Sequence, residues 1–123
     1  MKQILLVGLG GGVGSILRYL TSFFIFKKYS TAFPWGTFVV NILGCLIIGF
    51  LIGLSEKSDI LDKDLRLLLV TGFCGGYTTF SAFSAENFQL FETGNYILLT
   101  TYIAASVIIG ILATWSGYIL AKI

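Results

Sequence analysis

The sequence contains no histidine, a single proline and only two cysteines among its 123 residues. Without histidine or a cluster of carboxylates and thiolates, the chain lacks the usual general base of enzymes and the ligand set of a zinc or di-metal centre. Cys45 and Cys74 stand in separate apolar segments, where we interpret them as small packing residues. We therefore expect that the protein is not an enzyme.

Charge is also scarce. Charged residues make up 11% of the chain, and the formal net charge is +2. The sequence has no basic stripe of the kind that a phosphate backbone attracts, which excludes nucleic acid as a partner. Hydrophobic residues, by contrast, reach 56%, and the mean hydropathy is +0.92. At this length the composition predicts one integral membrane domain, residues 1–123.

The apolar residues fall into four segments, each long enough to cross a bilayer, which requires about 20 helical residues. We expect an all-α fold with spans at about residues 3–26, 34–54, 65–91 and 96–120. Pro34 suits the first turn of the second span, where a missing N–H costs little, and Trp35 suits interface depth. Four crossings place both termini on the same side of the membrane.

Glycines recur at intervals of four residues. The opening "MKQILLVGLGGGVGS" lacks the spacing of a nucleotide-binding loop, and no cleavage site typical of a secretory signal follows it. Such small-x-x-x-small pairs let helix backbones approach closely in lipid. We expect this role for the pairs Gly8/Gly12, Gly10/Gly14, Gly49/Gly53 and Gly72/Gly76.

The distribution of basic residues gives little bias in orientation. The side of the termini would carry Lys2, Lys57, Lys63, Arg66 and Lys122, and the other side Lys27 and Lys28, with Arg18 at intermediate depth. This asymmetry is weak for a rule that counts Lys and Arg near span ends. Insertion in both orientations is therefore conceivable. A homodimer of two antiparallel copies would provide the inverted repeats that many transporters use.

The third span contains "TGFCGGYTTFSAFS", residues 71–84, an unusually polar stretch for a membrane helix. Gly75 and Gly76 offer conformational freedom, and Thr78 and Thr79 can return hydrogen bonds to freed backbone groups. Irregular backbone survives at membrane depth only where protein or a polar cavity covers it. We therefore predict a broken third helix and a buried polar site. The alternative, that the glycines only permit a close helix crossing, remains open.

Phe80 and Phe83 lie on one face of this span, three residues apart. Simple packing would explain the aromatic pair alone. Packing would not explain why polar residues, which are costly in a membrane helix, lie within two turns of this pair: Thr79, Ser81, Ser84 and Glu86.

The stretch "GFCGGYTTFSAFSAE" resembles the signature of the Fluc/CrcB fluoride channels. The similarity extends to "GGGVGSILRY" in the first span, "GTFVVNILGC" in the second, and Tyr102 with Ser106 in the fourth. It implies a dual-topology homodimer in a bacterial inner membrane. Two antiparallel pores, each lined by both subunits, would export fluoride passively.

The resemblance also assigns roles to individual residues. Phe80 and Phe83 match the phenylalanines whose ring edges line the permeation path, and Asn41 matches an amide donor near the vestibule. Thr79, Tyr102 and Ser106 match a track of hydroxyl groups beside Glu86, to which Ser81 adds a donor. Gly75 and Thr78 match residues whose backbone carbonyls hold a structural sodium ion. Arg18 matches an arginine with an expected role in vestibule potential or dimer structure.

Two other functions agree less well with the residues. A proton-coupled exporter of the small multidrug resistance type also has four spans, but it requires an acidic residue in the first span, where this chain has Arg18. A membrane assembly subunit without transport would have few, scattered polar residues, whereas here they converge on the third and fourth spans.

Overall fold

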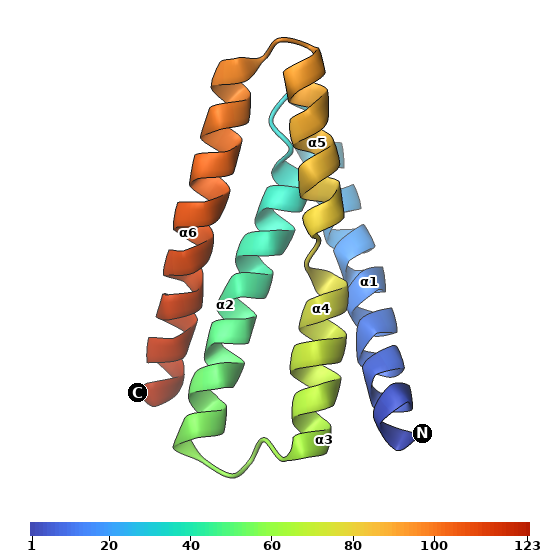
Figure 1. Ribbon diagram of the computed structural model, residues 1–123, viewed down its shortest axis with the longest axis vertical. Helices are drawn as coiled ribbons and strands as arrows, with labels where there is room; N and C mark the ends of the chain where they lie inside the picture. Colours follow the sequence, from blue (N-terminus) through green and yellow to red (C-terminus); the bar gives the residue numbers. More distant parts are fainter.

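The computed structural model describes residues 1–123 and is entirely helical (Figure 1). Four helical segments are long and apolar enough to cross a membrane, as predicted, so the protein is a multi-pass membrane protein. Both termini lie at the same end of the molecule, the lower end in Figure 1. The segments are α1 (Lys2–Lys28), α2 (Trp35–Lys57), a composite third crossing (Lys63–Glu92) and α6 (Tyr96–Lys122).

The third crossing consists of four pieces. It begins with the short α3 (Lys63–Arg66), continues as a π-helical segment η1 (Leu67–Cys74) and α4 (Gly75–Tyr77), and ends with α5 (Phe80–Glu92). Asp62 caps its start, because its carboxylate accepts a hydrogen bond from the Leu65 N–H at 2.8 Å. Gly94, with φ of +74°, makes the turn into α6. Each crossing extends one to three residues beyond most of the expected boundaries because its ends carry the polar and basic residues.

Glycines let α1 pack directly on the backbone of the third crossing. A Cβ atom at Gly10 would lie 2.8 Å from the Phe73 amide nitrogen, and one at Gly14 would lie 2.8 Å from that of Tyr77. Gly76 in turn faces the backbone of Gly11. Gly8 and Gly12 do not make the expected close contacts within this chain, because nothing lies within 4 Å of a Cβ atom at either position.

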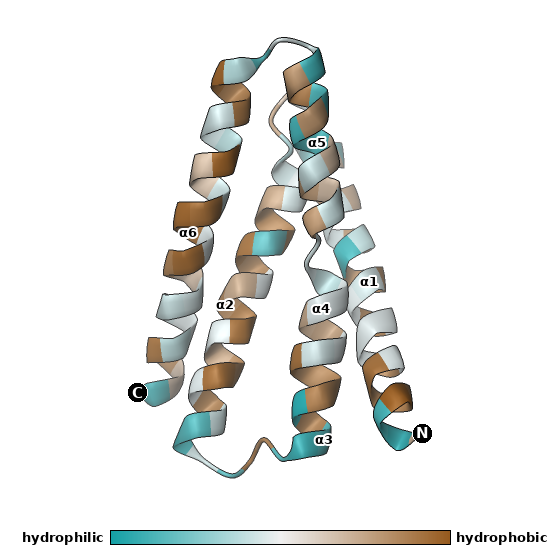
Figure 2. Ribbon diagram, viewed as in Figure 1, coloured by the Kyte–Doolittle hydropathy of each residue, from teal (hydrophilic) through white to brown (hydrophobic).

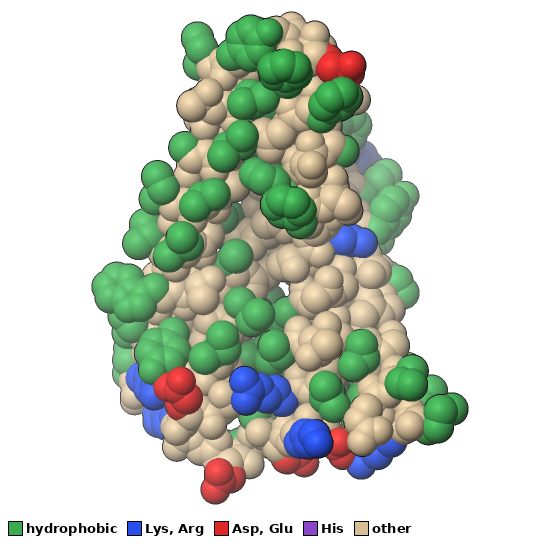
Figure 3. Space-filling view, viewed as in Figure 1, with side chains coloured by type: hydrophobic (Ala, Val, Ile, Leu, Met, Phe, Trp, Pro, Cys, Tyr) green, Lys and Arg blue, Asp and Glu red, His purple; other side chains and the backbone are tan.

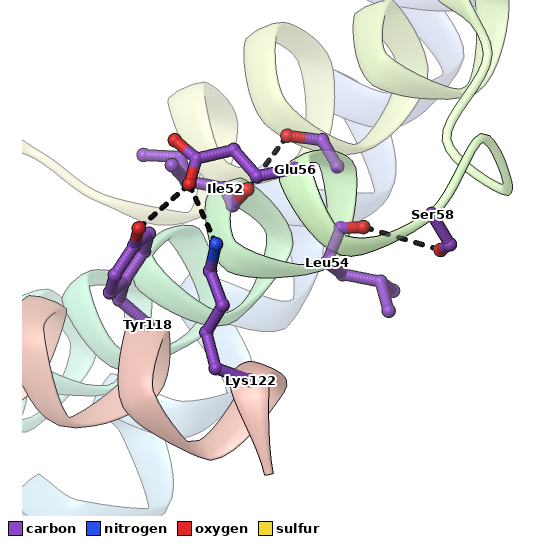
Figure 4. Close-up of polar contacts among 7 residues, drawn as sticks. Ile52, Leu54, Glu56, Ser58, Tyr118 and Lys122 are labelled. Atoms are coloured by element: carbon purple, nitrogen blue, oxygen red, sulfur yellow. Dashed lines mark hydrogen bonds and ion pairs between the residues drawn. The ribbon is translucent and has the colours of Figure 1, made fainter.

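A second glycine seam joins α2 to α6. A Cβ atom at Gly53 would lie 2.6 Å from the Tyr118 carbonyl oxygen, and one at Gly117 would lie 2.8 Å from the Phe50 amide nitrogen. Near the chain termini, Glu56 closes this seam by accepting hydrogen bonds from Tyr118 at 2.7 Å and Lys122 at 2.9 Å (Figure 4). The fold thus consists of two tightly packed helix pairs, α1 with the third crossing and α2 with α6.

Polar residues concentrate at the helix ends and in the α2–α3 connection (Figure 2). Most charged side chains visible in Figure 3 gather at the end that holds the termini, where Lys2 pairs with Asp64. Much of the remaining surface is apolar, with Phe80 79% and Ile97 85% exposed. Such a surface suits lipid or another apolar protein surface.

Candidate functional site

The third crossing is interrupted at Thr78 and Thr79. Thr78 has φ and ψ of −80° and 159°, and Thr79 has −148° and 122°, so both residues are extended. The expectation that Gly75 and Gly76 supply the irregular backbone is wrong, because both belong to α4. Gly76 instead provides the close contact with Gly11, and the helix ends at the next residue, Tyr77.

Side chains of α1 and α2 satisfy the freed backbone groups. Asn41 Nδ2 donates to the Thr79 carbonyl at 3.0 Å, and Asn41 Oδ1 accepts from the Thr79 N–H at 2.8 Å. Arg18 donates to the Thr78 carbonyl at 3.2 Å, and Ser15 to that of Gly76 at 3.4 Å. Unpaired backbone groups are costly in lipid, so these donors allow the extended segment to exist at membrane depth.

Several backbone carbonyls lose their regular helical donors at this point, and those of Gly75 and Thr78 are among them. In a continuous helix, the Thr79 N–H would bond to the Gly75 carbonyl, but it donates to Asn41 instead. The Ala82 N–H would bond to the Thr78 carbonyl, but it donates to Thr79 Oγ1 at 3.2 Å. The carbonyl oxygens of Gly75 and Thr78, the two predicted sodium ligands, are therefore released from the helical ladder. Oxygen atoms of this kind are the ligands that a hard cation prefers.

A cavity of about 500 Å³ lies beside the interruption. It brings together residues from α2, the third crossing and α6. Seven of the predicted site residues line it: Asn41, Gly75, Thr78, Thr79, Phe80, Phe83 and Ser106. Cys45 and Cys74 also line it, although sequence reasoning assigned them to packing alone. A Cβ atom on Gly110 of α6 would lie 3.6 Å from Cys45 Sγ, an ordinary van der Waals distance.

The two phenylalanines differ in their surroundings. Their ring centroids lie 5.9 Å apart. The Phe83 ring packs edge to face on Tyr102, with centroids 5.0 Å apart, whereas the Phe80 side chain is 79% exposed. Because an aromatic edge carries partial positive charge, rings at a cavity can present a weakly attractive surface to an anion.

The Ser106 hydroxyl is buried and has no hydrogen-bond partner. Buried hydroxyl groups are nearly always paired, often with the i−4 carbonyl when they lie in a helix. Ser106 also lines the cavity. Its hydroxyl is thus a free donor at the wall of the candidate site.

The predicted hydroxyl track divides between two places. Thr79 Oγ1 lies 3.3 Å from Ser81 Oγ, and Ser81 is exposed outside the cavity lining. Tyr102 is fully buried, and its hydroxyl donates to Glu86 Oε1 at 3.5 Å. Glu86 lines a different cavity, toward the end opposite the termini. Tyr102 therefore stands between the two cavities.

Sequence reasoning missed Thr37. It lines the second cavity together with Glu86. The sequence could have indicated Thr37, because it lies four residues before Asn41 and therefore on the same face of α2.

Helix dipoles add to the electrostatics of the interruption. The 13-residue α5 begins at Phe80, so its partial positive charge faces the cavity that Phe80 and Phe83 line. The helix that ends at Tyr77 directs its partial negative charge to the same point. An anion and a cation therefore find favourable positions on opposite sides of Thr78 and Thr79.

Comparison with known proteins identifies the family of this chain. The profile of a family described as CrcB-like protein, Camphor Resistance (CrcB), matches residues 5–118. The chain belongs to the CrcB-like family. The family prediction made from the third-span motif is thereby confirmed.

Several curated members of the CrcB-like family that carry the name fluoride-specific ion channel FluC are similar over nearly the whole chain. The protein of Azobacteroides pseudotrichonymphae is 51% identical over 122 residues, 99% of this chain and 98% of that protein. The protein of Flavobacterium psychrophilum is 52% identical over 122 residues, with the same coverage. That of Leptospira interrogans is 41% identical over 121 residues, 98% of this chain and 95% of that protein. These names describe ion channels, so the CrcB-like chain is not an enzyme.

Proposed function

We propose that the protein is a fluoride-selective channel that lets cytoplasmic fluoride leave the cell passively. The observation that carries the proposal is the cavity at the interruption, which combines aromatic rings, an unpaired hydroxyl and a helix N-terminus. The names of the similar CrcB-like proteins support fluoride as the ion. The relatives are bacterial, and we place the channel in the bacterial inner membrane.

The fluoride pathway runs along weak donors. Phe80 and Phe83 meet the ion with their ring edges, and the Ser106 hydroxyl donates to it. Asn41 Nδ2 uses one hydrogen on Thr79 and keeps a second for the anion. Thr79 and Ser81 provide further hydroxyl groups. Tyr102 would join them by turning toward the ion its single hydroxyl hydrogen, which donates to Glu86 in this structure. Sites of modest strength admit an ion and also release it.

We further propose that two antiparallel copies assemble into a dimer with two pores. The exposed Phe80 ring supports this, because a pore-lining ring that is 79% exposed in one protomer requires a second wall. The weak difference in basic residues between the two ends permits both orientations. Membrane lipid covers the remaining apolar surface.

A sodium ion would be a structural partner at the dimer axis. The released carbonyl oxygens of Gly75 and Thr78 fit such an ion, and two copies would contribute four of them. Nothing lies within 4 Å of a Cβ atom at Gly75, which leaves room for the second copy. The ion would supply positive charge near the anion pathway. Arg18, which donates to the Thr78 carbonyl, contributes charge and holds that carbonyl in place.

No chemical step is required for export. An inside-negative potential favours the exit of a monovalent anion by about 2.3 kcal/mol per 100 mV when concentrations are equal.

Ion efflux from liposomes tests the proposal. Purified protein should release loaded fluoride electrogenically, with no release of loaded chloride. Replacing sodium by N-methyl-glucamine should weaken the flux or the dimer. Proton-dependent export of organic cations without fluoride flux would instead identify the small multidrug type of exporter, which Arg18 in the first span disfavours. Equal fluoride and chloride release would contradict selectivity.

A further inference from the structure

The second cavity, with a volume of about 640 Å³, is distinct from the one at the interruption. It lies at the end opposite the termini, where the end of α1, the α1–α2 connection and the start of α2 meet α5 (Figure 1). Glu86 is the single residue of the fluoride pathway that lines it, and the rest of the pathway lies elsewhere.

Aromatic rings from two elements line this cavity. Tyr19 and Phe23 of α1 stack with their centroids 6.1 Å apart. Phe33 and Trp35, before and at the start of α2, form a second pair 4.5 Å apart. The faces of such rings are electronegative and attract organic cations. At the rim, the Lys28 ammonium already lies 5.5 Å from the centroid of the Tyr29 ring.

Glu86 is the only charged side chain in the cavity lining, and it has no cationic partner. The two ion pairs of the protein, Lys2–Asp64 and Lys122–Glu56, lie at the other end. The hydrogen bond that the Glu86 carboxylate accepts comes from the neutral hydroxyl of Tyr102, and at 3.5 Å it is long. A partly buried carboxylate without a cation, among aromatic rings, is complementary to a positive charge that carries apolar substituents.

We propose that this cavity binds an organic ammonium group, held by the Glu86 carboxylate and by the aromatic rings that include Tyr19 and Trp35. Two sources of this chemistry exist: the headgroup of an aminophospholipid and a free alkylammonium ion. The inference goes beyond the channel function and does not depend on fluoride flux.

Trp35 provides a direct readout, because the chain has only two tryptophans and Trp115 lies on α6 outside the cavity lining. In the Trp115→Phe variant, in phosphatidylglycerol nanodiscs, tetramethylammonium should change Trp35 fluorescence with saturation. The neutral analogue tert-butanol should not. Glu86→Gln should weaken the apparent affinity at least about tenfold, the factor that 1.4 kcal/mol represents.

Glu92→Gln is the matched control, since it removes the same charge from α5 at a residue outside the cavity lining. It should leave the tetramethylammonium affinity unchanged. Nanodiscs with phosphatidylethanolamine distinguish the sources: competition with tetramethylammonium supports the lipid headgroup, and its absence supports a free ammonium ion. No saturable Trp35 response in phosphatidylglycerol, or an equal response in Glu86→Gln, overturns the proposal.

Discussion

Asn41 of α2 holds both backbone groups of Thr79, donating to its carbonyl at 3.0 Å and accepting from its N–H at 2.8 Å. A side-chain amide thus takes the place that a neighbouring backbone would occupy in a sheet. The same contact diverts the N–H that would otherwise occupy the Gly75 carbonyl. One residue therefore fixes the extended segment and releases a candidate cation ligand.

Asn41→Ala should lower stability by about 2 kcal/mol, because it removes two hydrogen bonds worth about 1 kcal/mol each. Fluoride flux should fall as well, since the extended segment loses its support. Thermal unfolding in detergent and liposome efflux measure the two effects. Asn95→Ala is a suitable control, because Asn95 precedes α6 without a side-chain cap hydrogen bond. Wild-type stability in Asn41→Ala would contradict the role of the two Asn41–Thr79 hydrogen bonds.

Phe80→Ile and Phe83→Ile should each lower fluoride flux about fivefold or more, the effect of about 1 kcal/mol of lost ion stabilisation. Both variants should remain dimeric by cross-linking. Phe83→Ile should also reduce thermal stability, because the Phe83 ring packs on Tyr102. Phe88→Ile, at another exposed position of α5, should conduct normally. Normal flux in both pathway variants would refute the assigned route.

Ser106→Ala should lower fluoride flux without lowering the stability of the protein. Because the Ser106 hydroxyl is buried without a partner, its removal should leave stability unchanged or raise it by up to about 1 kcal/mol. Flux should nevertheless fall, since the cavity loses a donor. Thr101→Ala serves as a control on α6, because the Thr101 hydroxyl already bonds to the Ile97 carbonyl at 2.8 Å and is exposed. A variant that conducts as well as the wild type would remove Ser106 from the pathway.

Gly49→Ala should disrupt the α2–α6 seam, because the added Cβ atom would overlap the Thr114 carbonyl. We expect a loss of about 2 kcal/mol, within the usual range for overpacking. Gly8→Ala should be tolerated, since the position is open, and a gain of up to about 1 kcal/mol is expected from helix propensity. Equal melting temperatures of the two variants would be inconsistent with the seam.

The sequence predicted four crossings and the neighbourhood of the site, because bilayer thickness and hydropathy constrain both strongly. It misplaced the irregular backbone, since Gly75 and Gly76 permit a break but do not require one. Whether a glycine ends a helix depends on its partners, and Gly76 is needed for contact with Gly11. The hydrogen bonds between Asn41 and Thr79 could not be predicted from the sequence either, because they depend on how α2 faces the third crossing. Similarly, Gly8 and Gly12 follow the packing pattern, yet only the arrangement of the helices decides which pairs are used.

The donors that hold the interrupted crossing, Ser15, Arg18 and Asn41, all precede it in the chain. During synthesis, which proceeds from the N-terminus, the first two helices leave the ribosome before Thr78 does. The extended residues are therefore synthesised after the hydrogen-bond donors of α1 and α2 that pair with their backbone groups. A permuted gene that encodes the third crossing first would expose the backbone groups of Thr78 and Thr79 to lipid before Arg18 and Asn41 were made.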